Sequence, residues 1–465
     1  MKNHRITTVF LSSVLLSMPL SACSSNSKPA DTNSSPSANN GRTTVTVSVL
    51  KKDPFLQEAE RLFEEANPNI DIDIRSYVAT PEGGGEKRMV MRSPEGDKNS
   101  EADLEKYRTG VNAELMSGKG TDLIALENLP YAKYADKKLL ANLDDLIQKD
   151  SGFRASDYYT GVFNSMKLDG KTFAIPVHFK MNMTLGNAPL LAEKGIAVDD
   201  SKWTWKEMLD LGRQAVQSGG NATAVWTGKP KTDLISDIVM SQYGKLVTGK
   251  KAAFDAPEFV SLLEQVGDMY DKGQILETAD MANAGKDVFK SMSVPMPMQL
   301  LFMPQMMYEG KGTIYATPSD GGKKGGITIT SDLMFGINEK SKNKAEAWKF
   351  LQFLLSENIQ SKPGMMGFAV HKASLEKQLR QSVEQLASGR IKLQGPNGAT
   401  PSGAIDEKQF QSILQLVEKA DQYAAGDPNV LKIVKEETQA FFNKSKTAKA
   451  AAGLIQNRVT TYLNE

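Results

Sequence analysis

Hydrophobic and polar positions at the start of the folded region alternate with a period of two, then of 3.6, then of two again. The β-branched run 43–50 (TTVTVSVL) predicts a strand. Apolar residues then recur at helical spacing over 55–66, after Asp53-Pro54, which is a capping acceptor followed by proline at the first helical position. Isoleucines at 70, 72 and 74 alternate with charged residues and predict a second strand. This strand–helix–strand order predicts a parallel α/β sheet with a right-handed crossover.

The rest of the chain continues this alternation of strands and helices. The Gly-rich stretch 80–100 is predicted to be a long loop, either mobile or functional. Asp169-Gly170 predicts a hairpin turn. Further strands are expected at 121–126, 223–226, 312–316 and 327–338, and helices at 102–116, 345–355 and 429–442.

The first 42 residues have a pattern of their own. A basic start and an apolar run of about 15 residues, too short for the ~20 that span a bilayer, predict a secretory signal. Leu20-Ser21-Ala22-Cys23 resembles a bacterial lipobox, which implies a signal peptide over 1–22 and acyl chains on Cys23. The alternative is an ordinary signal peptide that is cut nearby and leaves a free thiol. Residues 23–42 are rich in Ser, Asn and Pro and are predicted to be a flexible tether.

Composition excludes several classes of function. With 56 Lys+Arg against 55 Asp+Glu, the chain lacks the basic excess of a nucleic-acid binder. One cysteine allows no intrachain disulfide, and three histidines argue against a histidine-built zinc site, so no metal or cofactor is expected. We find no G-x-S-x-G, P-loop or H-E-x-x-H motif, and acid–base chemistry would rest mainly on carboxylates.

Several segments together resemble one family, the substrate-binding lipoproteins of bacterial ABC importers, in the group that includes sugar binders. Their order and spacing carry the resemblance more than any single segment does. The segments are SGKGTDLI (117–124), DGKTFAIP (169–176), WTWKEM (203–208), AEAW (345–348) and the C-terminal run 455–465.

The resemblance implies an α/β fold of two lobes, the periplasmic-binding-protein-like fold, with a ligand cleft between them. Lobe one would comprise 43–177 with 295–334, and lobe two 180–292 with 336–465. The crossings between the lobes would lie near His178, Val294 and Phe335.

Candidate ligand-binding residues follow strands or lie at the first crossing. Ligands of open α/β folds bind beyond the carboxyl ends of strands, which favours residues that directly follow a strand or lie in the next loop. Asp53 and Asp233 are equally well explained as helix caps, Lys180 as a solvated hinge residue, and Trp226 as a core residue. The candidates are Lys52, Asp53, Glu127, Asn128, Trp226 and Asp233 after strands or in the loop that follows one, with His178 and Lys180 at the crossing.

The function that these features predict is solute binding for import, most simply of a sugar or oligosaccharide. The protein would be a monomer without catalytic residues, anchored by lipid on the outer face of the cell membrane, with the permease subunits of an ABC importer as partners. Two other functions remain open: a carboxylate-based surface glycan hydrolase or lyase, and a ligand-sensing lipoprotein.

Overall fold

A computed structural model describes residues 41–78, 95–201, 203–279, 285–318, 326–362, 365–390, 405–424 and 426–465. The predicted signal peptide, nearly all of the tether, and 80–94 of the predicted loop lie outside these residues. Residues 95–100 belong to a helix, so the loop ends earlier than predicted. A compact unit extends from Arg42 to Glu465. No helix within the described ranges is both long and apolar enough to cross a membrane.

The first three elements confirm the predicted strand–helix–strand unit. β1 (Thr43–Val49) pairs in parallel with β2 (Ile70–Ser76), and α1 (Pro54–Ala66) connects them. The Asp53 carboxylate accepts a hydrogen bond of 2.8 Å from the backbone N–H of Leu56 and so caps α1. Because the apolar positions of α1 repeat at helical spacing, they form one face, and that face buries Phe55 and Phe63.

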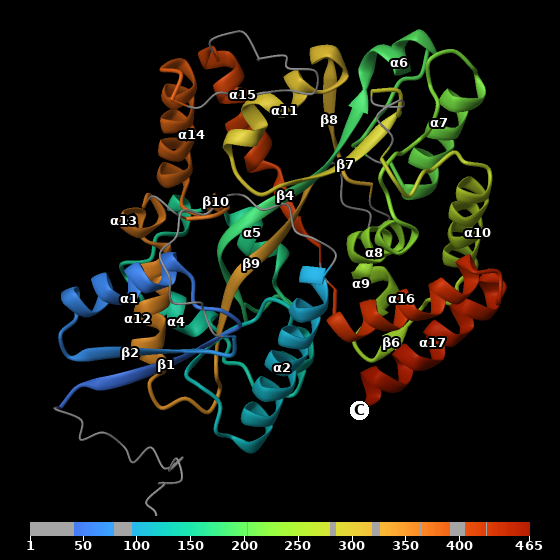
Figure 1. The fold of residues 1–465 in the computed structure, drawn as a ribbon. Coiled ribbons are helices and arrows are strands. Elements are labelled where there is room, and N and C mark those ends of the chain that lie inside the picture. Colours follow the sequence, from blue (N-terminus) through green and yellow to red (C-terminus); the bar gives the residue numbers. More distant parts are fainter. Residues whose placement is uncertain are drawn as a thin grey trace, which may run out of the picture. The chain divides into compact units, whose positions relative to one another are not determined.

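One mixed sheet organises the molecule, in the order β10-β4-β9-β3-β1-β2. β4 and β9 are its long strands, and they run between the two groups of helices seen in Figure 1. β11 pairs with β9, and β7 and β8 pair with β4. The predicted strand 223–226 forms only isolated bridges, from Ala224 to Asp287 and from Trp226 to Ile275. The remaining strands are β3 (Leu123–Ala125), β4 (Ile175–Asn187), β5 (Val247–Thr248), β6 (Lys251–Ala252), β7 (Phe289–Val294), β8 (Gly312–Ala316), β9 (Ile327–Ile337), β10 (Phe368–Ala369) and β11 (Ala420–Tyr423).

The helices predicted at 102–116, 345–355 and 429–442 appear as α2, α12 and α16. The helices after α1 are α2 (Glu95–Ser117), α3 (Tyr131–Asp136), α4 (Asp144–Lys149), α5 (Thr160–Ser165), α6 (Ala188–Glu193), α7 (Trp205–Gln217), α8 (Lys231–Ser241), α9 (Tyr243–Leu246), α10 (Pro257–Asp271), α11 (Met298–Met306), α12 (Lys344–Leu355), α13 (Glu357–Gln360), α14 (Lys372–Ala387), α15 (Glu407–Glu418), α16 (Pro428–Phe442) and α17 (Ala448–Asn464).

Two large hydrophobic cores hold these elements, with a smaller one around Tyr107 and Tyr131. The first core contains side chains of β1, β4, β9, α1, α12, α14 and α15. The second contains side chains of α6 to α10, α16 and α17. In Figure 1, α1 and α12 lie on one side of the long strands, and α10, α16 and α17 lie on the other.

The packing differs from the predicted lobe boundaries after residue 336. The sequence assigned 336–465 to lobe two, yet α12, α14 and α15 pack in the first core, where the rings of Phe63 and Phe350 lie 5.0 Å apart. Only α16 and α17 join the second core. The reason is that β9 ends beside β3, so the next helix covers the same sheet, and the chain leaves that core only after β11.

Candidate functional site

Parallel pairing brings the predicted residues of the first core to one edge of the sheet. Val47 of β1 is paired with Leu123 of β3, so the carboxyl ends of these strands are neighbours. Asp53 follows β1 in the sequence, and Glu127 follows β3. The two carboxyl groups interact electrostatically, and Asp332 of β9 interacts with Glu127 in the same way. Three acidic side chains from separate segments therefore gather at this edge.

Asp332 is held by two basic side chains from β4. His178 Nδ1 lies 3.2 Å from one carboxylate oxygen, and Lys180 Nζ forms an ion pair with the other. Burial alone would raise the pKa of Asp332, but its contacts with His178 and Lys180 hold it below its ordinary value. Asp332 is therefore ionised at neutral pH, and its carboxylate stays half-exposed.

Glu127 has the opposite electrostatic environment. Burial raises the pKa of Glu127 to about 8, and the negative charges of Asp332 and Asp53 add to the rise, while backbone N–H groups oppose it. Its Oε2 atom is buried and has no hydrogen-bond partner among the described residues. A buried carboxyl oxygen without a donor is costly, which adds to the cost of ionising Glu127.

Tyrosine rings lie close to Glu127. Burial raises the pKa values of Tyr107 and Tyr423, and the charge of Glu127 raises both further. The Tyr107 hydroxyl donates to the carbonyl of Ala125 at 2.6 Å. The ring centroid of Tyr423 lies 6.3 Å from that of Tyr131. Tyr107 and Tyr131 are buried, whereas Tyr423 is partly exposed. An exposed aromatic face next to polar groups suits a sugar ring, which has C–H groups on its faces and hydroxyls around its rim.

Gly367 packs closely against the basic side of the site. Its φ of 113° is a conformation that favours glycine, and a Cβ atom there would lie 2.7 Å from His178 Nδ1. The next two residues form β10, in which Phe368 pairs with Phe179 and Ala369 with His178. The segment 367–369 thus packs against His178 and helps to fix its position.

Lys52 and Asn128, the other predicted residues that follow β1 and β3, are engaged with residues other than Glu127 and Asp332. Lys52 Nζ forms an ion pair with Glu60 at 2.5 Å. Asn128 is exposed and has a φ of 64°, and its carbonyl accepts a hydrogen bond from Arg108 Nε. The positive φ of Asn128 therefore places it in the turn that leads from β3 to α3.

Two predicted residues lie in the second group of helices. Trp226 is only 1% exposed and packs in the second core, with its ring centroid 6.2 Å from that of Trp205. This burial corrects the expectation of a stacking surface, because flanking bridges on both sides of 224–226 place the ring among helices. Asp233 is exposed in the first turn of α8, whose N-cap is Pro230 and has no side-chain cap.

The sequence analysis missed Asp332, Tyr131 and Tyr423. Asp332 had a signal, since it is the only charged residue in the otherwise apolar and hydroxylated strand ITITSDLMFGI. The tyrosines had none, because the interaction of Tyr423 with Glu127 and the packing of Tyr131 against Tyr423 depend on how distant segments pack. Among the described residues, no group of three or more acidic, histidine or cysteine side chains is placed to hold a metal ion.

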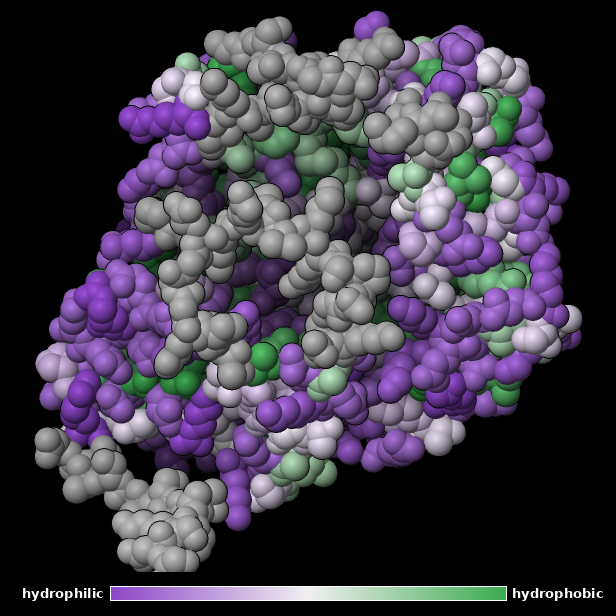
Figure 2. Space-filling view, in the orientation of Figure 1, coloured by the Kyte–Doolittle hydropathy of each residue, from purple (hydrophilic) through white to green (hydrophobic). Residues whose placement is uncertain are grey.

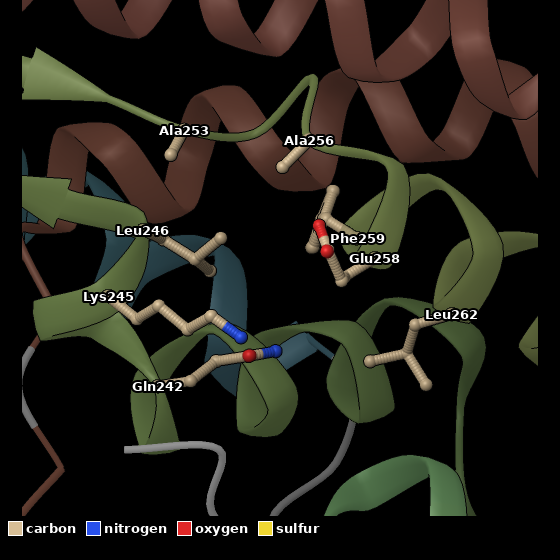
Figure 3. A pocket seen from close by; sticks show the side chains of 8 residues that line it. All are labelled: Gln242, Lys245, Leu246, Ala253, Ala256, Glu258, Phe259 and Leu262. Carbon is tan, nitrogen blue, oxygen red and sulfur yellow. The ribbon is translucent and has the colours of Figure 1, made fainter. Parts of the chain in front are cut away.

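A separate small pocket lies in the second core and offers no rival site. Its volume is about 50 Å³. Figure 3 shows Lys245 and Gln242 on one side of it and Glu258 and Leu262 on the other. The face over α16 and α17 is mostly hydrophilic in Figure 2 and shows no broad apolar surface.

Comparison with known proteins gives consistent matches. The model of the bacterial extracellular solute-binding protein family matches residues 49–361. A putative binding protein of Brucella abortus (strain 2308) is 24% identical over 342 residues, covering 71% of this chain and 75% of the relative.

Many solved structures resemble the fold, and two of them serve as examples. The sugar-binding protein MalE of Xanthomonas citri has a TM-score of 0.57 at 16% identity, over 91% of this chain and 98% of its own. The ABC substrate-binding protein Lmo0181 of Listeria monocytogenes, solved with cycloalternan, has a TM-score of 0.53 at 17% identity, over 91% and 99%. These likenesses confirm the predicted two-lobed periplasmic-binding-protein fold.

Proposed function

Because the chain belongs to the bacterial extracellular solute-binding protein family, we propose that it binds a sugar or oligosaccharide and delivers it to the permease of an ABC importer. The observation that carries this proposal is the group of polar side chains at the sheet edge. Asp332 is ionised, Glu127 has a buried oxygen without a partner, and Tyr423 interacts with Glu127. Charged hydrogen-bond partners and aromatic rings together match the chemistry of a sugar.

The long strands supply the means of closure. β4 starts in the first core, at Ile175 and Val177, and ends at Asn187, whose side chain donates to the carbonyl of Asp287 beside the second core. Closure of lobes around a ligand commonly uses a few residues at the ends of elements as hinges. A ligand bound at Asp332 would therefore lie next to the segments that connect the lobes.

The lipid anchor is part of the same proposal. The lipobox-like segment ending at Cys23 supports acylation, and more than one acyl chain gives stable anchoring. Residues 24–42 would then tether the folded body to the outer face of the membrane, within reach of the permease.

A second function has one observation in its favour. Glu127 and Asp332 are two carboxyl groups whose environments push their pKa values in opposite directions, as in acid–base pairs of glycan-cleaving enzymes. Incubation with oligosaccharides separates the two functions. Binding without product supports the importer component, and release of shorter sugars supports the enzyme.

The direct test is a binding screen by thermal shift and calorimetry across mono- and oligosaccharides. A ligand at 100 times its Kd stabilises a protein by about 2.7 kcal/mol. Asp332→Asn should weaken the binding of any sugar that the screen finds, because it removes the charge that organises His178 and Lys180. Asp73→Asn, at a half-exposed position on β2, is the matched control and should bind normally. Equal affinity of both variants would contradict the proposed site.

A further inference from the structure

A lysine of α3 reaches the C-terminal end of α17. Lys133 Nζ donates a hydrogen bond of 2.9 Å to the carbonyl of Tyr462 and lies 4.0 Å from the centroid of the Tyr462 ring. Lys137, which directly follows α3, donates from its Nζ to the main-chain oxygen of Glu465 at 3.1 Å. In Figure 1 the end of α17 marked C is the end nearest to α2. Two lysines next to each other in space thus hold the last turn of a helix that is distant in sequence.

The two sides of this contact belong to different hydrophobic cores. Tyr131 and Tyr134 of α3 are buried in the smaller core beside the sheet, and the Tyr134 hydroxyl donates to Asn112 of α2 at 2.6 Å. α17 packs in the second core, and the Tyr462 hydroxyl donates to Asp427 at 2.9 Å. Each partner is therefore fixed within its own lobe, and the contact between them bridges the lobes.

The contact lies on the side of the sheet where a ligand is expected. α3 begins shortly after Glu127, which follows the carboxyl end of β3. Asp427 caps α16 at the point where the chain passes from β11 into the second core. Ligands of open α/β folds bind beyond the carboxyl ends of strands. Opening of the lobes on this side would therefore separate Lys133 from Tyr462.

The chemistry of the contact is favourable for a cation. The last carbonyls of a helix lack intrahelical partners and carry partial negative charge, and the carbonyl that Lys133 reaches is one of them. The face of the aromatic ring attracts the same ammonium. The acids Asp427 and Glu465 also attract it, whereas Lys137 and Lys250 repel it. The attraction is thus built mainly from the carbonyl and the ring.

We propose that Lys133 is a latch residue, which holds the two lobes together across the ligand cleft by its contact with Tyr462. The proposal rests on the proposed closure around a ligand and names a contact that favours it. Because the latch consists of protein groups alone, it favours the closed arrangement with or without a sugar. A bound sugar leaves more slowly as a result, since the lobes must open before it is released.

Small-angle X-ray scattering of the ligand-free protein tests the latch without any sugar. Lys133→Met removes the ammonium and keeps most of the side chain, Lys133→Arg keeps a charged donor, and Lys149→Met changes an exposed lysine of α4 as the matched control. We expect the ratio of closed to open protein to fall about three- to tenfold in Lys133→Met. Its radius of gyration should therefore increase, while Lys133→Arg and Lys149→Met keep the radius of the wild type. Equal radii for all four proteins would overturn the latch, and so would a smaller radius for Lys133→Met.

Stopped-flow release of the best-binding sugar gives the second measurement. Lys133→Met should release the sugar about three- to tenfold faster than the wild type, with an unchanged association rate and an unchanged unfolding midpoint. A merely structural contact would lower the midpoint of Lys133→Met and leave the release rate as it is, which would also overturn the latch. If no sugar binds, the proposed function fails, and the radii of the ligand-free proteins still decide the latch.

Discussion

Replacement of Glu127 by glutamine should make the ligand-free protein more stable at pH 8. The carboxyl has a pKa of about 8 in the fold against an ordinary value of 4.5. A raised pKa means that the native state holds a proton that the unfolded chain has lost, so stability falls as the pH rises between these two values. Glutamine keeps the shape of the protonated acid and cannot ionise.

The size of the effect follows from the shift of roughly 3.5 pKa units. At 1.36 kcal/mol per unit, the ionisation of Glu127 costs the wild-type fold up to about 5 kcal/mol at high pH. The difference between variant and wild type should grow by as much as about 1.4 kcal/mol for each pH unit above 5 and level off above 8. Asp237 and Asp427 also have pKa values raised by burial, but they are present in both proteins and cancel in the difference.

The assay is urea or thermal unfolding of both ligand-free proteins at pH 5, 6, 7 and 8, with Glu258→Gln as a control that should follow the wild type. Curves for Glu127→Gln that run parallel to those of the wild type over this range would refute the account of Glu127 as a buried, mostly protonated acid.

Three further predictions concern other parts of the chain. Gly367→Ala should lower the free energy of unfolding by about 1–3 kcal/mol and weaken sugar binding, because residue 367 has a backbone conformation that favours glycine and the added Cβ would meet His178. The control Gly244→Ala, whose Cβ meets open space, should melt like the wild type. Trp226→Ala should cost about 3–5 kcal/mol in an unfolding assay and leave sugar affinity unchanged, since the ring is buried in the second core; weaker binding at unchanged stability would restore the stacking role. Cys23→Ser should release the protein from membranes in cell fractionation, and acyl chains detected on that variant by mass spectrometry would count against the lipobox.

Local patterns predicted those parts of the structure that depend on local sequence. The alternation in 43–50 and 70–74 and the Asp53-Pro54 cap identified the first strand–helix–strand unit. Because residues that follow neighbouring parallel strands meet at one edge, Asp53 and Glu127 could also be placed together.

The remaining parts depend on long-range packing. Asp332 reaches His178 and Lys180 only because the pairing of β4 with β9 shifts at two irregularities, between Pro176 and His178 and between His178 and Lys180. Periodicity indicates that α12 has an apolar face but not which core that face covers, and the lobe boundary was therefore placed too early. The burial of Trp226 also depends on long-range packing. Its position at the end of a predicted strand suggested an exposed ring, but α7 and α8 pack around it in the second core.

Small-angle X-ray scattering with and without a bound sugar tests the central claim most directly, because a ligand held between two lobes must draw them together. We predict a smaller radius of gyration for the protein saturated with the sugar that binds best, and no change with the same sugar added to Asp332→Asn at a concentration that saturates only the wild type. A radius that stays the same when the wild-type protein binds its sugar would contradict closure of the lobes around the site at Asp332 and Glu127.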